Sequence, residues 1–384
     1  MIRLNQLTLL PAATKLSRLQ LVAVAVACSL LGTLVLLMVH AAGPLAAVEA
    51  ESGTISGGAT VGAASGASGS GVVSFNAIPA TPTPTPTPTP APTATPSSSP
   101  AACAGAVHTP GGSDAGGGCW PGAANTGIPA GTTLTTYTGP CTITTAGAII
   151  DGKTVNCDLT IAAANVMIKN SKVNGVVFLD TDNAGSAGWS FTIQDAEVDG
   201  GQQQHPAVGW GNLRLVRANI HGGITSAQCE EKSVSCVIQD SYLHGQYIQP
   251  NSNWHLGGFL SDGGGPISIS HSTVACDQTA TYGSDGGCTG DINLIPNFAT
   301  AHDVTIHHNL LPASLSLAFC TYAGDRHDGA YPYGNHIVYT DNIFQRGSNG
   351  KCGAYGPVAG WGTGTGNTWT NNKWTDGADV IPEY

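Results

Sequence analysis

The chain has 384 residues, of which 10% are charged, against ~25% in an average protein, while 41% are hydrophobic and 52 are glycine. This composition excludes a coiled coil and a chain disordered throughout, because glycine breaks long helices and enough apolar side chains remain for a core. The part after Val48 carries 10 Lys and Arg against 24 acidic residues, a net charge of −14. We therefore expect no nucleic-acid partner, since binding phosphates normally requires a basic face.

Residues 1–43 contain an apolar stretch, residues 19–39, that holds no charged side chain and is long enough to cross a bilayer as a helix. Three basic residues precede this stretch and two acidic residues follow it, so the positive-inside rule places the rest of the chain outside the cell. We expect a single-pass membrane anchor here. A cleaved signal peptide is the alternative, because Val39–Ala41 resembles a small-residue cleavage site.

Two low-complexity segments follow, a Gly/Ala/Ser-rich spacer at 44–78 and a Thr/Pro-rich linker at 79–102. The ends of the spacer, at 48–51 and 72–75, resemble the first strands of β-sandwich carbohydrate-binding modules. A stretch this short cannot form a sandwich of about 100 residues, so we expect a remnant without a sugar site. The linker repeats Thr-Pro and predicts a disordered, extended stalk of polyproline type, roughly 60 Å long.

An eight-residue phrase recurs through the remaining segment, residues 103–384. In every copy the first and sixth residues are apolar and the fourth is small or hydrogen-bonding, which predicts two short strands joined by a polar bend. The copies begin 22 to 37 residues apart, so we expect them to stack as successive rungs of a coil. The copies begin at Ile168, Ile193, Leu215, Ile238, Ile269, Ile306, Val338 and Trp369, and their fourth residues are Ser171, Ala196, Ala218, Ser241, Ser272, Asn309, Asp341 and Asn372.

These phrases resemble the rungs of right-handed parallel β-helix proteins, the pectate-lyase-like superfamily, over roughly residues 132–374. The resemblance implies an all-β solenoid with long loops on its later rungs. The superfamily includes polysaccharide lyases, glycoside hydrolases, pectin esterases, phage tailspikes and adhesins, so the fold alone leaves the function open. The AsnThrAsp, AspAsp, GlyHisGly and ArgIleLys set of polygalacturonases and the Asp and Arg cluster of lyases do not occur.

We predict a cell-surface or secreted protein that binds extracellular polysaccharide. Two alternatives stay open within this prediction. In the first, the protein also cleaves the glycan, as a polysaccharide lyase or glycoside hydrolase. In the second, it is a non-catalytic adhesin or a structural protein of the envelope.

Ten cysteines follow the apolar stretch, and their even number indicates up to five disulfides in an exported chain. Zinc is the competing interpretation, but no CxxC pair occurs. The last two cysteines are 32 residues apart, the same as the step from Ile306 to Val338, which places them in one phase on adjacent rungs. Sequence proximity suggests the other pairs. The expected disulfides are Cys103–Cys119, Cys141–Cys157, Cys229–Cys236, Cys276–Cys288 and Cys320–Cys352.

The loops of the later rungs are the first place to look for a glycan site. Their aromatic residues can stack on sugar rings or simply pack the loops, and Arg326 can pair with a uronate carboxylate or with a neighbouring Asp. His255 and Asp262 are catalytic candidates that face opposite sides of a straight strand and meet only if the chain bends between them. The aromatic candidates for substrate binding are Trp254, Tyr282, Tyr331 and Tyr333.

A second set of catalytic candidates comes from the seventh position of successive copies, where Asp199, His221 and His244 share one phase. Adjacent rungs are about 4.8 Å apart, so each side chain contacts the next. Asp199 favours a protonated His221, whereas His244 opposes it, which predicts one acid and one base near neutrality. The alternative is a polar ladder on the surface without any chemistry.

Metal sites are a further expectation from the sequence. A divalent metal could take His221 and His244 together with His255 or Asp262. A calcium ion could be bound by carboxylates of one later loop, although their spacing lacks the EF-hand pattern. The carboxylates concerned are Asp277, Asp285 and Asp291.

Overall fold

The computed structural model describes residues 59–63, 71–75, 103–278, 285–314 and 316–382. The chain divides into two compact units, Met1–Thr95 and Pro96–Tyr384. In the first unit, β1 (Ala59–Ala63) and β2 (Gly71–Phe75) form an antiparallel pair. The predicted membrane segment and the Thr/Pro-rich linker lie outside the described residues. Among the residues that are described, no helix is both long enough and apolar enough to cross a membrane.

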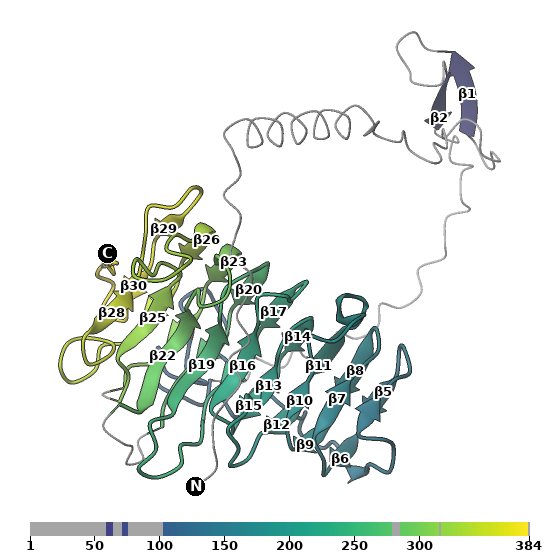
Figure 1. Ribbon diagram of the computed structural model, residues 1–384, viewed down its shortest axis with the longest axis horizontal. Helices are drawn as coiled ribbons and strands as arrows, with labels where there is room; N and C mark the ends of the chain where they lie inside the picture. Colours follow the sequence, from purple (N-terminus) through teal and green to yellow (C-terminus); the bar gives the residue numbers. More distant parts are fainter. Residues whose placement is uncertain (1–58, 64–70, 76–102, 279–284, 315, 383–384) are drawn as a thin grey trace, which may run out of the picture. The chain divides into compact units, whose positions relative to one another are not determined.

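The second unit is a solenoid of three parallel sheets, and each turn adds one strand to each sheet (Figure 1). The only helical element of the described part is a 3-10 turn at Ser186–Gly188. The structure therefore confirms the expected parallel β-helix. Sheet 1 contains β4 (Thr142–Ile143), β7 (Leu159–Ile161), β10 (Val177–Phe178), β13 (Val208–Gly209), β16 (Thr225–Cys229), β19 (His255–Ser261), β22 (Gly287–Leu294), β25 (Phe319–Ala323) and β28 (Gly356–Ala359).

The other two sheets contain the strands that the repeated phrase predicted. Sheet 2 contains β5 (Ile149–Asp151), β8 (Val166–Lys169), β11 (Phe191–Gln194), β14 (Leu213–Val216), β17 (Cys236–Gln239), β20 (Ile267–Ser270), β23 (His302–His307), β26 (Asn335–Thr340) and β29 (Thr368–Thr370). Sheet 3 contains β3 (Thr135–Thr136), β6 (Lys153–Val155), β9 (Lys172–Asn174), β12 (Glu197–Asp199), β15 (Asn219–His221), β18 (Tyr242–Leu243), β21 (Thr273–Val274), β24 (Leu310–Leu311), β27 (Ile343–Phe344) and β30 (Lys373–Trp374).

The core consists of columns of apolar side chains that point into the coil from the same position on successive rungs. Alternate residues of a strand face opposite sides, so only every second side chain enters the core. In sheet 2, β8, β11, β17 and β20 each alternate between buried and partly exposed residues. The column formed by the first residue of the phrase is fully buried and pairs in register through Ile168, Ile193, Leu215, Ile238, Ile269 and Ile306.

The expected register is wrong by one residue at the seventh copy. Ile306 pairs with Tyr339 rather than with Val338. The Tyr339 side chain is fully buried, because an aromatic ring fills this end of the core, and Val338 faces outward. The interior bend position is consequently Asn342, and Asp341 takes the preceding position with φ 60°, a left-handed conformation that Asp tolerates.

Asparagine side chains occupy the interior bend position on the last three rungs and form a ladder, Asn309, Asn342 and Asn372. The backbone N–H of Asn309 donates to Oδ1 of Asn342 at 2.9 Å, and the N–H of Asn342 donates to Oδ1 of Asn372 at 3.2 Å. The side-chain amide of Asn342 donates in turn to the carbonyl of Ile306 at 2.8 Å. The ladder thus satisfies main-chain groups that would otherwise be buried at the bend without partners.

All five expected disulfides are present, and they indicate an extracellular or secreted protein. The reason given for the last pair is nevertheless wrong. Cys320 lies in β25, whereas Cys352 lies in the loop before β28, and β25 pairs with β28 through Phe319 and Gly356. The two cysteines meet because this loop folds back over sheet 1, and they do not share one phase on adjacent rungs.

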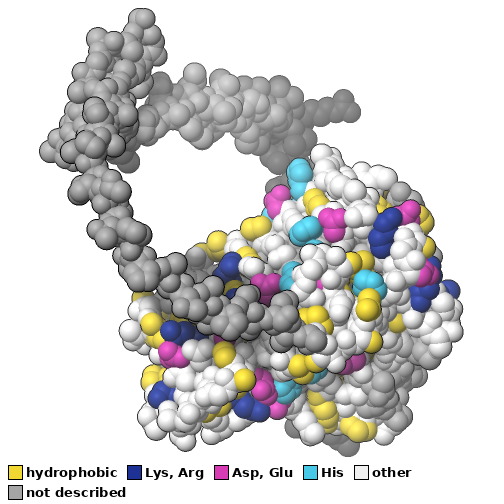
Figure 2. Space-filling view, turned by 180° about the vertical axis from the view of Figure 1, so that it is seen from behind, with side chains coloured by type: hydrophobic (Ala, Val, Ile, Leu, Met, Phe, Trp, Pro, Cys, Tyr) yellow, Lys and Arg dark blue, Asp and Glu magenta, His cyan; other side chains and the backbone are white. Residues whose placement is uncertain are grey.

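The N-terminal residues 103–127, which we call the strap, pack against the outside of the solenoid. Trp120 of the strap is fully buried, and its ring lies 5.1 Å from that of His308. The carboxylate of Asp114 lies 3.0 Å from Nε2 of His308 and 3.7 Å from Nε2 of His271. Figure 2 shows histidine and acidic side chains close together on the surface that is hidden in Figure 1.

We predict that replacing Asn342 by Ala lowers the free energy of unfolding by about 2–4 kcal/mol, because the N–H of Asn309 and the carbonyl of Ile306 both lose a partner in the interior. Chemical denaturation measures the change. Thr305→Ala, at an exposed position of β23, is the matched control and should change stability by no more than about 0.5 kcal/mol. An Asn342→Ala protein as stable as this control would contradict the ladder's role.

Candidate functional site

A cavity with a volume of about 690 Å³ lies on the outer face of sheet 1. We call it the groove. Strands β16, β19, β22, β25 and β28, which lie side by side in Figure 1, all contribute to it. Its floor is one outward-facing column of the sheet, formed in register by Leu260, Asn293, Tyr322 and Ala359.

The alternation of side chains in sheet 1 explains how a floor of mixed character arises. Phe259 and Ile292 point inward and are fully buried, so the residues that follow them, Leu260 and Asn293, point outward into the groove. The amide of Asn293 donates to the carbonyls of Phe259 and Gly290 at 3.3 and 3.0 Å, which fixes its orientation. These two bonds use both amide protons of Asn293, so the floor combines apolar surface with an anchored acceptor, the Oδ1 of Asn293, which has no hydrogen-bond partner among the described residues.

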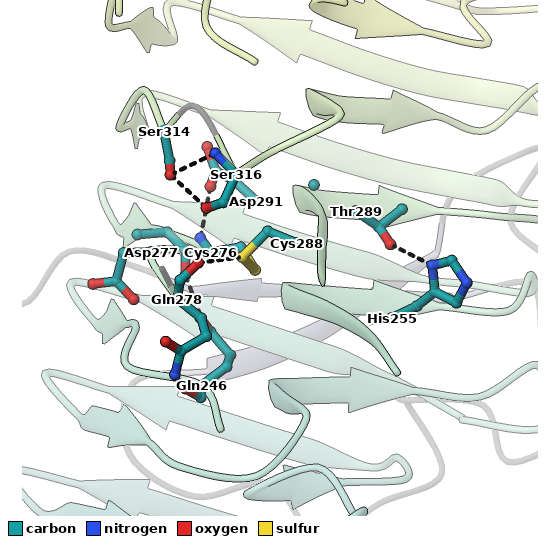
Figure 3. Close-up of a disulfide and its surroundings, with 12 residues drawn as sticks. Gln246, His255, Cys276, Asp277, Gln278, Cys288, Thr289, Asp291, Ser314 and Ser316 are labelled. Atoms are coloured by element: carbon teal, nitrogen blue, oxygen red, sulfur yellow. Dashed lines mark hydrogen bonds between the residues drawn. A yellow bond between two sulfur atoms is a disulfide. The ribbon is translucent and has the colours of Figure 1, made fainter. Parts of the chain in front are cut away.

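His255 and Asp262 both line the groove, from opposite ends of β19. The seven-residue strand is extended and separates them by roughly 20 Å, so they do not form the contact that a bend would have allowed. Nδ1 of His255 lies 3.3 Å from Oγ1 of Thr289, and the two side chains point toward one another (Figure 3). The two catalytic candidates thus share a cavity without acting on one atom.

Asp262 stands at the rim, where the chain leaves sheet 1. Its carboxylate accepts hydrogen bonds from the amides of Asn297 at 2.6 Å and Gln228 at 3.2 Å. Burial raises the pKa of Asp262, the bond from Asn297 opposes this shift, and the charge of Glu231 adds to it. A carboxyl group that holds its proton more tightly than usual in a cavity is a candidate proton donor.

Glu230 is a carboxyl group that sequence reasoning missed. Cys229 and Ser261 are paired in β16 and β19, so Glu230 and Asp262 follow at equivalent positions on neighbouring rungs. Burial raises the pKa of Glu230, the hydrogen bond from Thr181 opposes the shift, and the charges of Glu231, Asp182 and Asp262 add to it. Only the register of the strands reveals this pair, because the two residues are far apart in the sequence.

Arg326 also lines the groove, but its guanidinium is already engaged. Its Nε lies 3.1 Å from Oδ1 of Asp328, and its NH1 donates to Oδ1 of Asn297. Nearby Asp325 has a side chain that is only 2% exposed and accepts a bond from the N–H of Gly334 at 2.7 Å. The structure therefore shows the local ion pair, with Asp328, that was the alternative to a substrate contact.

The aromatic candidates lie outside the residues that form the groove. Trp254 is partly buried and packs against Tyr247, with ring centroids 6.2 Å apart. Tyr331 and Tyr333 are exposed, and Tyr333 packs on His327 at 5.7 Å. Tyr282 lies outside the described residues. Tyr322, in β25, is the aromatic side chain that lines the groove among the residues described.

The ladder of Asp199, His221 and His244 forms as expected but lies on sheet 3 and in the turn after it, away from the groove. Nδ1 of His221 lies 3.6 Å from Oδ1 of Asp199, and the rings of the two histidines are 5.4 Å apart. Sequence reasoning missed Glu197, whose Oε1 lies 3.2 Å from Nε2 of His221. Burial lowers the pKa of His244 to about 4, with Asp277 opposing the shift and His221 adding to it.

The structure does not assemble the expected metal sites. Within the described residues, His221 and His244 do not meet His255 or Asp262 in one ligand group. The same is true of the proposed calcium ligands Asp277, Asp285 and Asp291.

Asp291 does lie close to the sulfur atoms of Cys320 and Cys352, but these cysteines form a disulfide and supply no thiolate. Burial raises the pKa of Asp291 well above its usual range, with the N–H of Cys276 opposing the shift. That N–H donates to Oδ1 of Asp291 at 2.7 Å, next to the disulfide between Cys276 and Cys288 (Figure 3). A fully buried acid of this kind is part of the interior and not an open site.

Comparison with known proteins gave no match: no family model, no curated protein and no solved structure is significantly similar to this chain.

We predict that the effect of Asp262→Asn on stability depends on pH. The native chain holds the Asp262 proton to higher pH than the unfolded chain does, so stability falls as pH rises from the unfolded pKa, about 3.9, through the native pKa. The Asp262→Asn variant has no proton to lose at this position, so its free energy of unfolding does not fall for this reason. Its free energy of unfolding, relative to wild type, should increase between about pH 4 and pH 7.

Chemical denaturation at both pH values measures this difference. Asp285→Asn is the matched control, because the side chain of Asp285 is 83% exposed. A constant difference between wild type and Asp262→Asn across this interval would show that the proton of Asp262 is not held by the fold.

Proposed function

We propose that the protein binds an extracellular polysaccharide in the groove on the outer face of sheet 1. The observation that carries the proposal is a cavity of about 690 Å³ whose floor combines Leu260 and Tyr322 with the amide of Asn293. Sugar rings present apolar C–H faces and hydroxyl edges, so they are recognised by apolar or aromatic surface beside fixed hydrogen-bonding groups. The five disulfides support an extracellular location.

The shape of the groove favours a polymer over a small molecule. Five neighbouring strands contribute to it, and strands in a sheet lie about 4.8 Å apart, so the groove extends roughly 19 Å along the solenoid. This length accommodates several sugar units in a row. The outward-facing positions of sheet 1 recur on each rung. Such a surface also suits a polysaccharide, whose sugar units recur along the chain.

The charge of the groove favours an uncharged or amino-bearing glycan over a polyuronate. Three carboxyl groups line it, those of Asp262, Asp325 and Asp328, and among the described residues of its lining Arg326 is the one Lys or Arg, beside the imidazole of His255. The guanidinium of Arg326 is paired with Asp328. A uronate chain would therefore meet net negative charge without a free cation to neutralise it.

Glycan hydrolysis is the second candidate, and the raised pKa of Asp262 favours it. In its protonated form, the Asp262 carboxyl group could donate its proton to the glycosidic oxygen as the bond from that oxygen to the anomeric carbon breaks and water adds to the anomeric carbon. Elimination by a lyase is less well supported, because it requires a cation to neutralise the substrate carboxylate and Arg326 is engaged.

We further propose that the solenoid is displayed at the cell surface. Residues 19–39 would anchor the chain and the Thr/Pro-rich linker would hold the solenoid away from the membrane. The resemblance of the rungs to the pectate-lyase-like superfamily supports a polysaccharide ligand. A non-catalytic adhesin would use the same groove for binding alone.

The test is binding of the purified secreted part to an array of neutral, amino-bearing and uronate polysaccharides, followed by end-product analysis. We expect binding to a neutral or amino-bearing glycan. Tyr322→Ala should weaken it by roughly tenfold, since a buried aromatic contact is lost, while Tyr331→Ala, an exposed aromatic outside the groove, should not.

Three outcomes separate the candidates. New reducing ends that disappear in Asp262→Asn would identify a hydrolase, whereas binding without new ends would identify an adhesin. Absence of binding to every polysaccharide, or equal binding by wild type and Tyr322→Ala, would exclude the groove as the glycan site.

A further inference from the structure

A second, smaller cavity lies on the same face of the solenoid, at the early rungs. It has a volume of about 220 Å³ and is bounded by the end of β10, by the residue that follows β13, by the residue that precedes β7 and by the loop between β12 and β13. Sites for drug-sized ligands usually measure roughly 300–1,000 Å³, so this cavity suits a smaller group, such as one sugar ring. Its lining includes Asp158, Phe178, Gln203, His205 and Trp210.

Two aromatic rings form the apolar part of this cavity. The rings of Phe178 and Trp210 are 5.3 Å apart and meet edge to face, which leaves a ring face turned away from their contact. The carbonyl of Trp210 accepts a hydrogen bond from the N–H of Glu230 at 2.8 Å, so the next rung holds this residue in place. Both side chains are partly exposed. The aromatic surface is therefore preorganised and open to a ligand.

Polar side chains complete the cavity opposite the rings. Oδ1 of Asp158 accepts bonds from the N–H of Val176 at 2.9 Å and from the amide of Gln203 at 3.4 Å. The imidazole of His205 lies 6.2 Å from the ring of Trp210. A carboxylate, an amide and an imidazole beside an aromatic face supply the donors and acceptors that sugar hydroxyls require. No Lys or Arg lines the cavity among the described residues, which disfavours a phosphate or uronate.

The strand register connects this cavity to the groove. Phe178 pairs with Gly209, and Val208 pairs with Ala227, so Gly209 lies beside Gln228 on the next strand. Gln228 pairs with Leu260, which begins the floor of the groove. One outward-facing column of sheet 1 thus runs from Phe178 into the groove. Gly209 contributes no side chain to it, and the ring of Pro206, which also lines the cavity, packs directly over Gly209.

We propose that the cavity formed by Phe178 and Trp210 is a remote subsite that binds one uncharged or amino-bearing sugar ring of the polysaccharide that occupies the groove. This inference rests on the proposed function. The column from Phe178 in β10 to Leu260 in β19, where the floor of the groove begins, spans three strand intervals, or roughly 14 Å, and the far end of the groove at β28 lies roughly 29 Å from β10, so only a ligand of several units fills both places. The subsite would add affinity for long chains and none for short ones, because the two contacts act together only through a continuous ligand.

The experiment compares the affinities of short (about two-unit) and long (about eight-unit) chito-, cello-, manno- and xylo-oligosaccharides by calorimetry, the long ones being sufficient to span both places. For the series that binds, wild type should bind the long ligand roughly tenfold more tightly than the short one. Trp210→Ala should abolish this ratio and leave the short ligand unchanged. Trp189→Ala, at a partly buried Trp that precedes β11 on sheet 2, is the matched control and should keep the ratio.

Gln203→Ala provides a second variant, because Gln203 is a loop residue outside the core and its loss should not affect folding. It should reduce the ratio severalfold. An undiminished ratio in Trp210→Ala and Gln203→Ala, or equal weakening of short and long ligands, would overturn the remote subsite while leaving the groove in place. Absence of binding by wild type to any of the four series would overturn the proposed function, and the subsite with it.

Discussion

Parallel pairing between successive rungs is the constraint on which the rest of this structure depends. A strand slipped by one residue would turn every side chain to the opposite face. Each rung must therefore repeat the inward apolar pattern of the rung before it. The buried asparagines enforce this register at the bends before the two-residue strands β24, β27 and β30, because Asn342 can bond Asn309 and Asn372 only when the bends are aligned. Such bonds are costly to leave unmade in the interior.

The same constraint generates the candidate site. Once the inward columns are fixed, the outward columns must also align, and residues about 30 positions apart come side by side. Leu260, Asn293 and Tyr322 become neighbours in this way, as do Glu230 and Asp262 at the rim. The surplus residues of the later rungs supply the walls. Repetition thus creates a long, nearly uniform surface, and variation in single side chains supplies the polar, charged and aromatic groups of the groove.

Burial and charge then distinguish positions that look alike in the repeat. Asp262 and Glu230 are partly buried among other carboxylates, which raises the pKa of both. His244 is buried beside His221, which lowers its pKa to about 4 and favours the neutral imidazole. The ladder of Asp199, His221 and His244 on sheet 3 has polar contacts typical of a site, but these residues do not line the groove. The groove combines such contacts with a cavity, and this is why the proposed function is assigned to sheet 1.

The sequence by itself determined the solenoid, because the apolar period is a local signal. The five cysteine pairs were expected mainly from their proximity in the chain, and the structure confirms them, although the register argument for Cys320–Cys352 was wrong. Sequence reasoning misplaced Tyr339 by one position, since Val338 and Tyr339 are both apolar and only packing shows which of them enters the core. His255, Asp262 and Arg326 were candidates from the sequence and do line the groove, whereas the tertiary structure alone placed Asn293 and Tyr322 together on its floor. The number of residues between equivalent positions on successive rungs depends on the length of the loops, and this length varies along the chain.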